Sequence, residues 1–250
     1  MKLQLIRHAT LAIEYGGLRI VVDPMLSEPE ANPPIANTPN ARHNPLVPMP
    51  VQAESLANAD LLIVTHLHQD HWDAAAATFF DKNLPLLCQP GDEPTLHQQG
   101  FSNAIPVQEH TTVGSVTFHR TGGRHGTGEI GLRMGQVSGF VFKANGEPTL
   151  YIAGDTIYCA EVEEALSRYR PEWTVVNAGA ARFLVGDPIT MTADDVAKVS
   201  EISPATKVVA VHMEAINHCL LMREELESEM ERRGLTGRVV VPNDGEVIRP

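Results

Sequence analysis

The sequence contains few cysteines, few basic residues and no long hydrophobic run. The three cysteines, Cys88, Cys159 and Cys219, are far apart and form no Cys-x-x-Cys pair. They predict buried, reduced thiols, as is usual in the cytosol, rather than a disulfide framework. The first eight residues lack the apolar core of a signal peptide, and no apolar segment approaches the length of a transmembrane helix. We therefore expect a cytoplasmic protein.

Negative charge dominates the composition, with 31 Asp and Glu residues against 19 Lys and Arg residues and a net charge of −12 at pH 7. A duplex nucleic acid or an anionic membrane surface needs a basic face on its partner, so we expect neither as a partner. The net charge does not fix the sign of a small substrate, because a locally positive metal site can still bind an anion. We expect a small-molecule substrate, and the sequence leaves open whether the chain forms a homo-oligomer.

Three histidines and one aspartate lie within six residues: His66, His68, Asp70 and His71. They follow Leu61–Val64, an apolar run that predicts a buried strand. Imidazole and carboxylate are the usual ligands of zinc and related divalent ions. The segment is too short for one ion to take all four side chains comfortably, so two ions that share them are the more natural interpretation. A histidine-rich surface turn is disfavoured, because it does not need three imidazoles directly after a core strand.

Further side chains of the ligand type follow other predicted strands. Asp155 comes just after the strand predicted over 149–153, and His212 directly follows the strand predicted over 207–211. His125 lies in a loop with four glycines, where the backbone must pass close to something. His119, on the preceding strand, and His110, at a loop edge, are the alternatives to His125, which we favour because of its glycine flanks and its place after the strand.

The remaining pattern predicts an α/β protein with two sheets face to face and helices outside, in one domain over residues 1–250. Residues 3–15 predict one or two strands, and Gly16-Gly17 predicts a hairpin turn to a strand over 18–22. Residues 25–51 carry seven prolines and predict a long irregular loop that forms a lid or pocket wall, with disorder of its middle as the alternative. Later strands are predicted at 84–88, 104–107, 115–118, 140–142, 175–176 and 238–242. Helices are predicted at 53–59, 72–80, 93–99, 161–168 and 222–233, and one starts at 192–195.

The order and spacing of these motifs resemble the metallo-β-lactamase superfamily, whose pattern is His-x-His-x-Asp-His, a later His, an Asp after a strand and a final His. The segments Arg7–Thr10, Val22–Pro24 and Asn44–Pro48 resemble the branch that contains ascorbate-6-phosphate lactonase and many uncharacterised hydrolases. The resemblance covers most of the chain. It implies a four-layer αββα sandwich with the metals at one edge, between the sheets.

The resemblance also implies a division of the ligands between two metal ions. One ion would take His66, His68 and His125, the other would take Asp70, His71 and His212, and Asp155 would bridge them. Zinc is the expected metal, and manganese or iron also suits these nitrogen and oxygen donors. No cysteine falls at a ligand position, which disfavours a Cys-containing β-lactamase site. His8, in the first strand segment, is expected to be a structural hydrogen-bonding residue under the site rather than a ligand.

A hydroxide held between two divalent ions can attack a carbonyl carbon or a phosphorus atom while one ion polarises the electrophilic oxygen. Asp70 could also orient this nucleophile. His218, which closely follows His212, is the candidate acid or substrate contact, with a helix-start histidine of no catalytic role as the alternative. Arg124 and Asn177 are candidates for binding substrate oxygens.

Three functions follow from this reasoning. The first is a metal-dependent hydrolase of a small ester, lactone or amide. The second is a phosphodiesterase acting on a small phosphodiester, and the third is a metal-holding sensor or scaffold without turnover. The third is least favoured, because all seven expected ligand positions have candidates.

Replacement of His119 by alanine should leave the metal content of the purified protein unchanged, because a histidine on a strand is more often a packed or surface residue than a ligand. Elemental analysis of the variant measures this content. Loss of one ion would move the assignment of the third histidine from His125 to His119.

Overall fold

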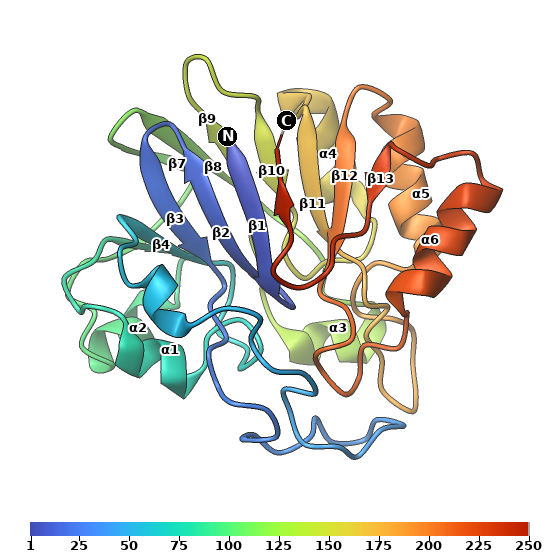
Figure 1. Ribbon diagram of the computed structural model, residues 1–250, viewed down its shortest axis with the longest axis horizontal. Helices are drawn as coiled ribbons and strands as arrows, with labels where there is room; N and C mark the ends of the chain where they lie inside the picture. Colours follow the sequence, from blue (N-terminus) through green and yellow to red (C-terminus); the bar gives the residue numbers. More distant parts are fainter. Residues whose placement is uncertain (250) are drawn as a thin grey trace.

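Two mixed sheets lie face to face in the computed structural model, which describes residues 1–249, and within these residues each sheet has seven strands (Figure 1). The first sheet has the spatial order β14-β1-β2-β3-β4-β5-β6 and the second the order β13-β12-β11-β10-β9-β8-β7. Strands of the first sheet are β1 (Lys2–Arg7), β2 (Thr10–Tyr15), β3 (Leu18–Val22), β4 (Leu61–Val64), β5 (Leu86–Cys88), β6 (Ala104–Pro106) and β14 (Val247–Ile248). Strands of the second are β7 (His110–Val113), β8 (Val116–Thr121), β9 (Gly139–Lys143), β10 (Leu150–Ile152), β11 (Trp173–Asn177), β12 (Lys207–Val211) and β13 (Val239–Val240).

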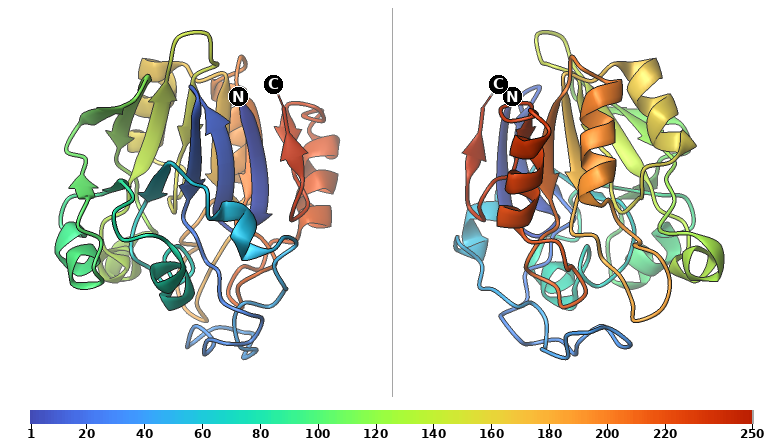
Figure 2. Two further views of the ribbon diagram at one scale, coloured as in Figure 1. Left: turned by 60° about the vertical axis from the view of Figure 1, so that its left-hand side comes forward. Right: turned by 90° about the vertical axis from the view of Figure 1, so that its right-hand side faces the viewer.

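Helices cover the outer faces of both sheets, as Figures 1 and 2 show. Against the first sheet pack the 3₁₀ helix η1 (Ala53–Leu56), α1 (Ala74–Phe79) and α2 (Glu93–Gln98). Against the second sheet pack α4 (Ala160–Tyr169), α5 (Ala193–Ile202) and α6 (Arg223–Arg232). The remaining helix, α3 (Gly128–Met134), lies below the sheets in the view of Figure 1. This arrangement confirms the predicted αββα sandwich. Within residues 1–249, no helix is long and apolar enough to cross a membrane.

Alternating apolar residues of the two sheets meet in the central core. Leu3 and Leu5 of the first sheet and Phe118 and Phe142 of the second belong to one buried cluster. Side chains at every second position of a strand point to the same face, so this spacing places one apolar row between the sheets. Tyr15 also links the sheets by a hydrogen bond, because its hydroxyl lies 2.9 Å from the carbonyl oxygens of both Phe142 and Pro148, to which it can donate.

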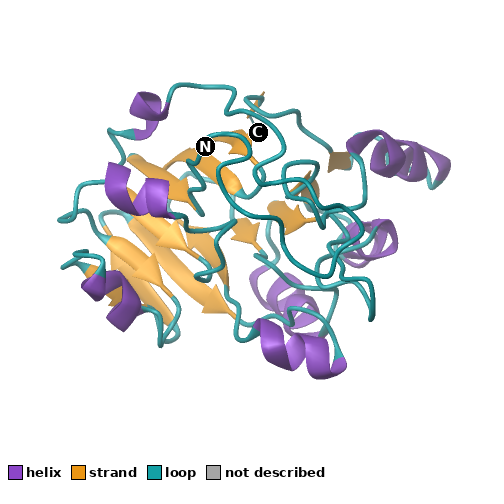
Figure 3. Ribbon diagram, turned by 90° about the horizontal axis from the view of Figure 1, so that it is seen from below, coloured by secondary structure: helices purple, strands orange, loops and turns teal. Residues whose placement is uncertain are grey.

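The carboxyl ends of several strands converge on one edge of the sandwich. β3, β4, β5 and β6 are parallel in the first sheet, and β10, β11, β12 and β13 are parallel in the second. Figure 3 looks at the molecule from below and shows loops, rather than strands or helices, crossing the middle of this edge. The residues that directly follow the strands are therefore brought together there.

The 25–51 segment contains no helix or longer strand in the structure, apart from one bridge between Asn32 and Asn44. It is held by the fully buried guanidinium of Arg7, which donates hydrogen bonds to the carbonyl oxygens of Met25, Ser27 and Val47. The irregular loop predicted from the prolines is thus confirmed, and the structure places it below the sheets (Figure 1).

Some elements differ from the sequence-based predictions. β7 and α3 were not predicted, because β7 (His-Thr-Thr-Val) is polar and α3 has no buried residue that would produce an apolar helical pattern. The strand predicted over 238–242 is limited to Val239–Val240, and the chain ends with β14 beside β1. The helix expected from Thr192 is confirmed, since Thr192 and Asp195 form a reciprocal capping box.

Replacement of Phe142 by alanine should lower the free energy of unfolding by about 3–5 kcal/mol, the usual cost of a cavity left by a large core side chain. The ring is fully buried and packs edge to face on Tyr15 and Phe118. Chemical denaturation of the metal-free protein measures the change. Lys143→Ala, at the next position of the same strand but with an exposed side chain, is the control and should cost less than about 1 kcal/mol. Equal costs for the two variants would contradict the placement of Phe142 in the core.

Candidate metal centre

Seven histidine and aspartate side chains meet at the loop-covered edge between the two sheets. The loop after β4 supplies four of them, and β8, β10 and β12 each lead into a segment that supplies one more. The seven residues are His66, His68, Asp70, His71, His125, Asp155 and His212. All but His68, which is half-buried, are buried. The structure thus brings together every residue that the sequence indicated as a metal ligand.

The donor atoms form three overlapping groups: His66, His68 and His125; Asp70, His71 and His212 together with His8; and His66, His71 and Asp155. In the first, His66, His68 and His125 have their donor atoms within 4.8 Å of one another, and His66 Nε2 lies 2.9 Å from His68 Nδ1. In the second, His212 Nε2 lies 3.2 Å from His71 Nε2 and 3.3 Å from Asp70 Oδ2. The first two groups resemble the division of ligands between two ions that the family resemblance implied, except that His8 also belongs to the second.

Asp155 lies between the first two groups and contacts both. Its Oδ2 is 3.4 Å from His125 Nε2 in the first group and 3.3 Å from His71 Nε2 in the second. Its Oδ1 is 3.2 Å from His212 Nε2 and accepts a hydrogen bond of 2.6 Å from the Asn177 amide. The carboxylate is therefore held in a position from which each oxygen can serve one group or both.

Partners outside the cluster set the direction in which the imidazoles point. His125 Nδ1 lies 2.9 Å from the carbonyl oxygen of Ile189, and His71 Nδ1 lies 2.8 Å from Asp23 Oδ2. A carbonyl or carboxylate oxygen only accepts, so both Nδ1 atoms carry hydrogen and, in the neutral rings, both Nε2 atoms present a lone pair. Such outer partners fix the tautomer of metal-binding histidines.

One contact inside the cluster sets two acceptor atoms against each other. The Nε2 lone pair of neutral His125 faces Oδ2 of the Asp155 carboxylate at 3.4 Å. Burial lowers the pKa of His125, so this ring does not resolve the conflict by taking a proton. A cation between these atoms would satisfy both of them, and nitrogen and oxygen donors at this spacing suit zinc, manganese or iron.

The pKa shifts show that the carboxylates and imidazoles of the cluster stabilise each other's charged forms. Burial raises the pKa of Asp155, but His212, His71 and His125 together lower it by more. The pKa of Asp155 therefore lies well below its usual value. Burial lowers the pKa of His71, but the carboxylates of Asp155, Asp23 and Asp70 raise it well above its usual value. Asp155 is thus an anion at neutral pH, and positive charge is strongly favoured beside it.

Three residues around the centre have a left-handed backbone although they are not glycines. His8, Asp23 and His212 have φ values of 61°, 46° and 66°, and each directly follows a strand, β1, β3 or β12. Such a conformation costs about 1–3 kcal/mol at a non-glycine residue and is concentrated at functional sites. In each case the turn ends the strand beside the cluster and gives the side chain its contacts there.

Asp23 belongs to the site but was not identified as such from the sequence. Its carboxylate accepts hydrogen bonds from the Thr65 amide and hydroxyl, both at 2.7 Å, besides its contact with His71. It therefore fixes the start of the histidine loop and one imidazole of that loop together. The available signal was its place directly after a strand, in Val22-Asp23-Pro24, which indicated only the family resemblance.

His8 has the hydrogen-bonding role that was expected of it. Its Nε2 lies 3.1 Å from Asp70 Oδ2, and its carbonyl oxygen accepts a hydrogen bond from the amide of His212. Its ring is fully buried and stacks on that of His212, with centroids 3.6 Å apart. His212 is also contacted by the buried thiol of Cys219, whose Sγ lies 3.5 Å from His212 Nδ1. No cysteine among residues 1–249 belongs to a group of donor atoms close enough to share an ion.

Other candidate residues lie in different places. His218 is buried beside Asp70 and His212, and its Nδ1 has no hydrogen-bond partner among residues 1–249. Asn177 is buried in the cluster, where its amide donates to Asp155, and its binding of substrate oxygens stays a prediction. Arg124 is exposed and bonds to Glu161. His119 lies on β8, where its ring packs near those of His110 and Tyr169, and it belongs to none of the donor groups.

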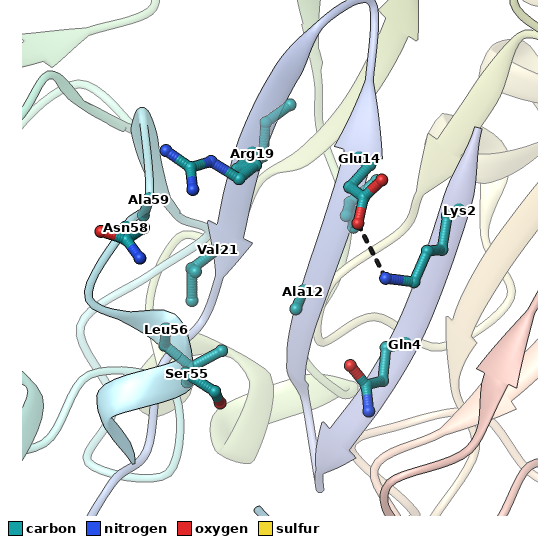
Figure 4. Close-up of a pocket in the computed structure, with 12 residues that line it drawn as sticks. Lys2, Gln4, Ala12, Glu14, Arg19, Val21, Ser55, Leu56, Asn58 and Ala59 are labelled. Carbon is teal, nitrogen blue, oxygen red and sulfur yellow. Dashed lines mark hydrogen bonds and ion pairs between the residues drawn. The ribbon is translucent and has the colours of Figure 1, made fainter. Parts of the chain in front are cut away.

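A separate hollow of about 260 Å³ lies on the outer face of β1, β2 and β3, beside η1 (Figure 4). Its wall includes the ion pair between Lys2 Nζ and Glu14 Oε1, which are 2.7 Å apart. None of the seven clustered residues lines it. This hollow is therefore separate from the cluster at the loop-covered edge.

Comparisons with known proteins relate the whole chain to metal-dependent hydrolases. The family model described as the β-lactamase superfamily domain matches residues 18–213. The chain is 35% identical to the UPF0173 protein YddR of Bacillus subtilis and 28% identical to a UPF0173 metal-dependent hydrolase of Azorhizobium caulinodans, with 98% of each chain covered in both comparisons. The crystal structure of an isothiocyanate hydrolase from Delia radicum gut bacteria is similar with a TM-score of 0.96 and 36% identity, over 100% of this chain and 99% of that one.

Asp23→Asn should weaken metal binding by about 10- to 100-fold, the usual effect of removing an outer partner of a ligand. An amide nitrogen in place of Oδ2 cannot accept from His71 Nδ1, so the imidazole loses its fixed tautomer. Titration of the metal-free protein with zinc, followed by calorimetry, measures the affinity.

Asp73→Asn is the matched control for this change. Asp73 is as buried as Asp23, but it caps α1 and bonds to Ser27 instead of touching an imidazole. Its variant should lose stability and keep the zinc affinity. Equal losses of affinity in both variants would show that Asp23 acts only through the general stability of the fold.

Proposed function

This chain belongs to the β-lactamase superfamily and is a metal-dependent hydrolase. We propose that it binds two divalent cations and hydrolyses a small uncharged substrate at a carbon atom. The observation that carries the proposal is the arrangement of two donor groups around one shared carboxylate, Asp155. One ion would be held by His66, His68 and His125. The other would be held by Asp70, His71 and His212. Zinc is the metal that we propose.

Two bound divalent ions would supply a water molecule of lowered pKa and a Lewis acid for the oxygen or sulfur atom bonded to the electrophilic carbon of the substrate. The protein's own side chains hold the two aspartates of the centre in place. Asp70 is fixed by the hydrogen bond from His8, so its carboxylate can orient an attacking water as well as hold a cation. Asn177 keeps Asp155 from rotating. Both aspartates are thus preorganised, which lowers the cost of reorganisation during the reaction.

We assign His218 the role of substrate contact. Burial lowers its pKa to about 4, although the nearby charge of Asp70 raises it. The ring is therefore neutral at pH 7, so it can donate one hydrogen bond to a substrate heteroatom but holds no extra proton to release. Its Nδ1 is buried and has no hydrogen-bond partner within residues 1–249, so a substrate heteroatom that reaches it would satisfy it.

A carbon-centred substrate suits the surroundings of the centre better than a phosphodiester. The small hollow next to Asp70 is lined by Met25, Ile35 and Ile216 together with asparagine, glutamine and proline side chains, and by no lysine or arginine of the described chain. In this hollow, an anionic phosphodiester would have no cationic side chain to neutralise it apart from the ions. Arg124 lines a separate hollow together with His125, and its charge is already paired with Glu161. Small esters, lactones and amides are uncharged and meet no such penalty.

Isothiocyanates are the first substrates that we propose within this class, because the isothiocyanate hydrolase is 36% identical over the whole chain. The balanced reaction is R–N=C=S plus two H₂O, giving R–NH₂, CO₂ and H₂S. Water adds to the central carbon, the C–S and C–N bonds break, and the protons of the two water molecules end on nitrogen and sulfur. A water of lowered pKa and a hydrogen-bond donor beside it are what this addition requires.

Purified protein should contain two equivalents of metal and hydrolyse 2-phenylethyl isothiocyanate much faster than bis-(4-nitrophenyl) phosphate, with 4-nitrophenyl acetate as the ester comparison. Elemental analysis and assays with and without a chelator test this. Asp155→Ala should lose both ions and more than about 100-fold in kcat/KM, beyond the range of an outer partner. Asp60→Asn, which changes an exposed carboxylate far from the centre, should change neither. One equivalent of metal would contradict the shared centre, and preference for the phosphodiester would contradict the substrate class.

A further inference from the structure

A large apolar pocket lies beside the candidate metal centre, between α3 and two loops. It encloses about 820 Å³, within the range of small-molecule sites. Half-buried apolar side chains line it, namely Ile35 of the 25–51 loop, Ile130 and Met134 of α3, and Phe183. The charged side chains that contribute to its wall, Glu129, Arg133 and Asp187, are all exposed.

Two side chains of the pocket wall also lie next to residues of the metal centre. Ile35 lines this pocket and also the small hollow that contains Asp70. On the other side, the ring centroid of Phe183 is 6.3 Å from that of His218. Both residues also pack against the buried apolar cluster that contains Met25, Ile189 and Ile216. Ile35 and Phe183 therefore form the part of the pocket wall that faces the metal centre.

The walls of the pocket are tied to the centre by the side chain of Asn217, which directly precedes His218. Its Oδ1 accepts from the amide of Ile35 at 3.0 Å, and its Nδ2 donates to the carbonyl oxygen of Ile35 at 3.1 Å. The two loops are joined as well, since the amide of Leu184 donates to the carbonyl oxygen of Asn37 at 2.7 Å. These bonds hold the pocket in one position relative to the proposed reactive carbon.

Apolar surface remains exposed at this pocket. Leu184 and Val185 are 66% and 80% exposed, and both line it. An exposed apolar patch next to a site is typical of a ligand-binding groove, because a bound apolar group releases the water that covers it. A charged group would instead lose its hydration there without gaining a buried partner.

We propose that this pocket binds an uncharged alkyl or aryl substituent of the substrate and sets the preference of the enzyme among substrates with the same reactive group. This inference rests on the proposed function, because it assumes that a carbon-centred substrate reacts at the metal centre. Ile35, Ile130, Met134 and Phe183 are the specificity-determining side chains. The reactive group lies at the metal ions beside His218, and the substituent lies along α3.

The test compares methyl, butyl and hexyl isothiocyanate with the metal-loaded enzyme. Each added methylene buried in the pocket should raise kcat/KM about threefold to fourfold. Ile130→Asn should reduce the ratio of the hexyl to the methyl value of kcat/KM at least tenfold. Met134→Asn, on the same face of the pocket, is the second variant if Ile130→Asn does not fold, as judged by circular dichroism.

Leu132→Asn is the matched control, because Leu132 lies on the same helix, is 83% exposed and does not line this pocket. It should leave the ratio of hexyl to methyl values unchanged. A flat dependence on chain length in the unmodified enzyme, or the same loss in the Ile130 and Leu132 variants, would overturn the inference while leaving the proposed hydrolase activity intact.

Binding of the uncharged dye Nile red separates a failure of this inference from a failure of the proposed function. If the enzyme hydrolyses no isothiocyanate or ester, the proposed function fails. The pocket is then supported by dye fluorescence that Ile130→Asn abolishes and Leu132→Asn retains, and overturned by a dye that does not bind. If Ile130→Asn instead converts a dimer into a monomer in analytical ultracentrifugation without altering the dependence on chain length, the face is a contact between two copies of the chain, and the inference is wrong.

Discussion

The buried carboxylate of Asp155 is the interaction on which the rest of the site depends. It lies 3.2–3.4 Å from imidazole nitrogens of both donor groups, in a place with almost no access to water. A buried anion that faces the unprotonated nitrogen of His125 is costly unless a cation lies between them. The hydrogen bond from Asn177 and the carbonyl oxygen that binds His125 Nδ1 hold these two side chains in that orientation. The fold thus holds donor atoms in an arrangement that a cation would complete.

The sandwich makes this arrangement accessible to a single chain. Parallel strands of two sheets end at the same edge, so residues as far apart as Asp23 and His212 enter one cluster after short turns. The left-handed backbone of His8, Asp23 and His212 is the strain that this convergence requires. Central packing between the sheets, around residues such as Phe142 and Tyr15, offsets that strain, and the loops are left to form the substrate side.

Local patterns predicted much of this from the sequence. The close spacing of His66, His68, Asp70 and His71 after an apolar strand predicts the centre, since a short loop can aim all four side chains at one place. Asp155 and His212 could be found because each follows a clear strand. The superfamily resemblance is confirmed by the family model and by relatives over the whole length, and the αββα fold by the two sheets and their helices.

What could not be predicted depends on contacts between distant residues. The bonds from Asp23 to Thr65 and His71, and from Asn177 to Asp155, join segments that no local pattern relates. Helix α3 was not predicted, because none of its residues is buried and its sequence therefore shows no apolar helical pattern. The pocket beside it depends on how Asn217 holds Ile35 in the proline-rich loop, and periodicity carries no information on such a loop.

X-ray diffraction from crystals of the metal-loaded protein, at the absorption edge of the bound metal, shows whether two cations share Asp155. We expect two anomalous peaks about 3.5–4 Å apart, the usual spacing of two-metal sites. One peak would lie among His66, His68 and His125, the other among Asp70, His71 and His212, and both would contact Asp155. A single peak, or a peak bound by His8 with Asp155 turned away, would contradict this expectation.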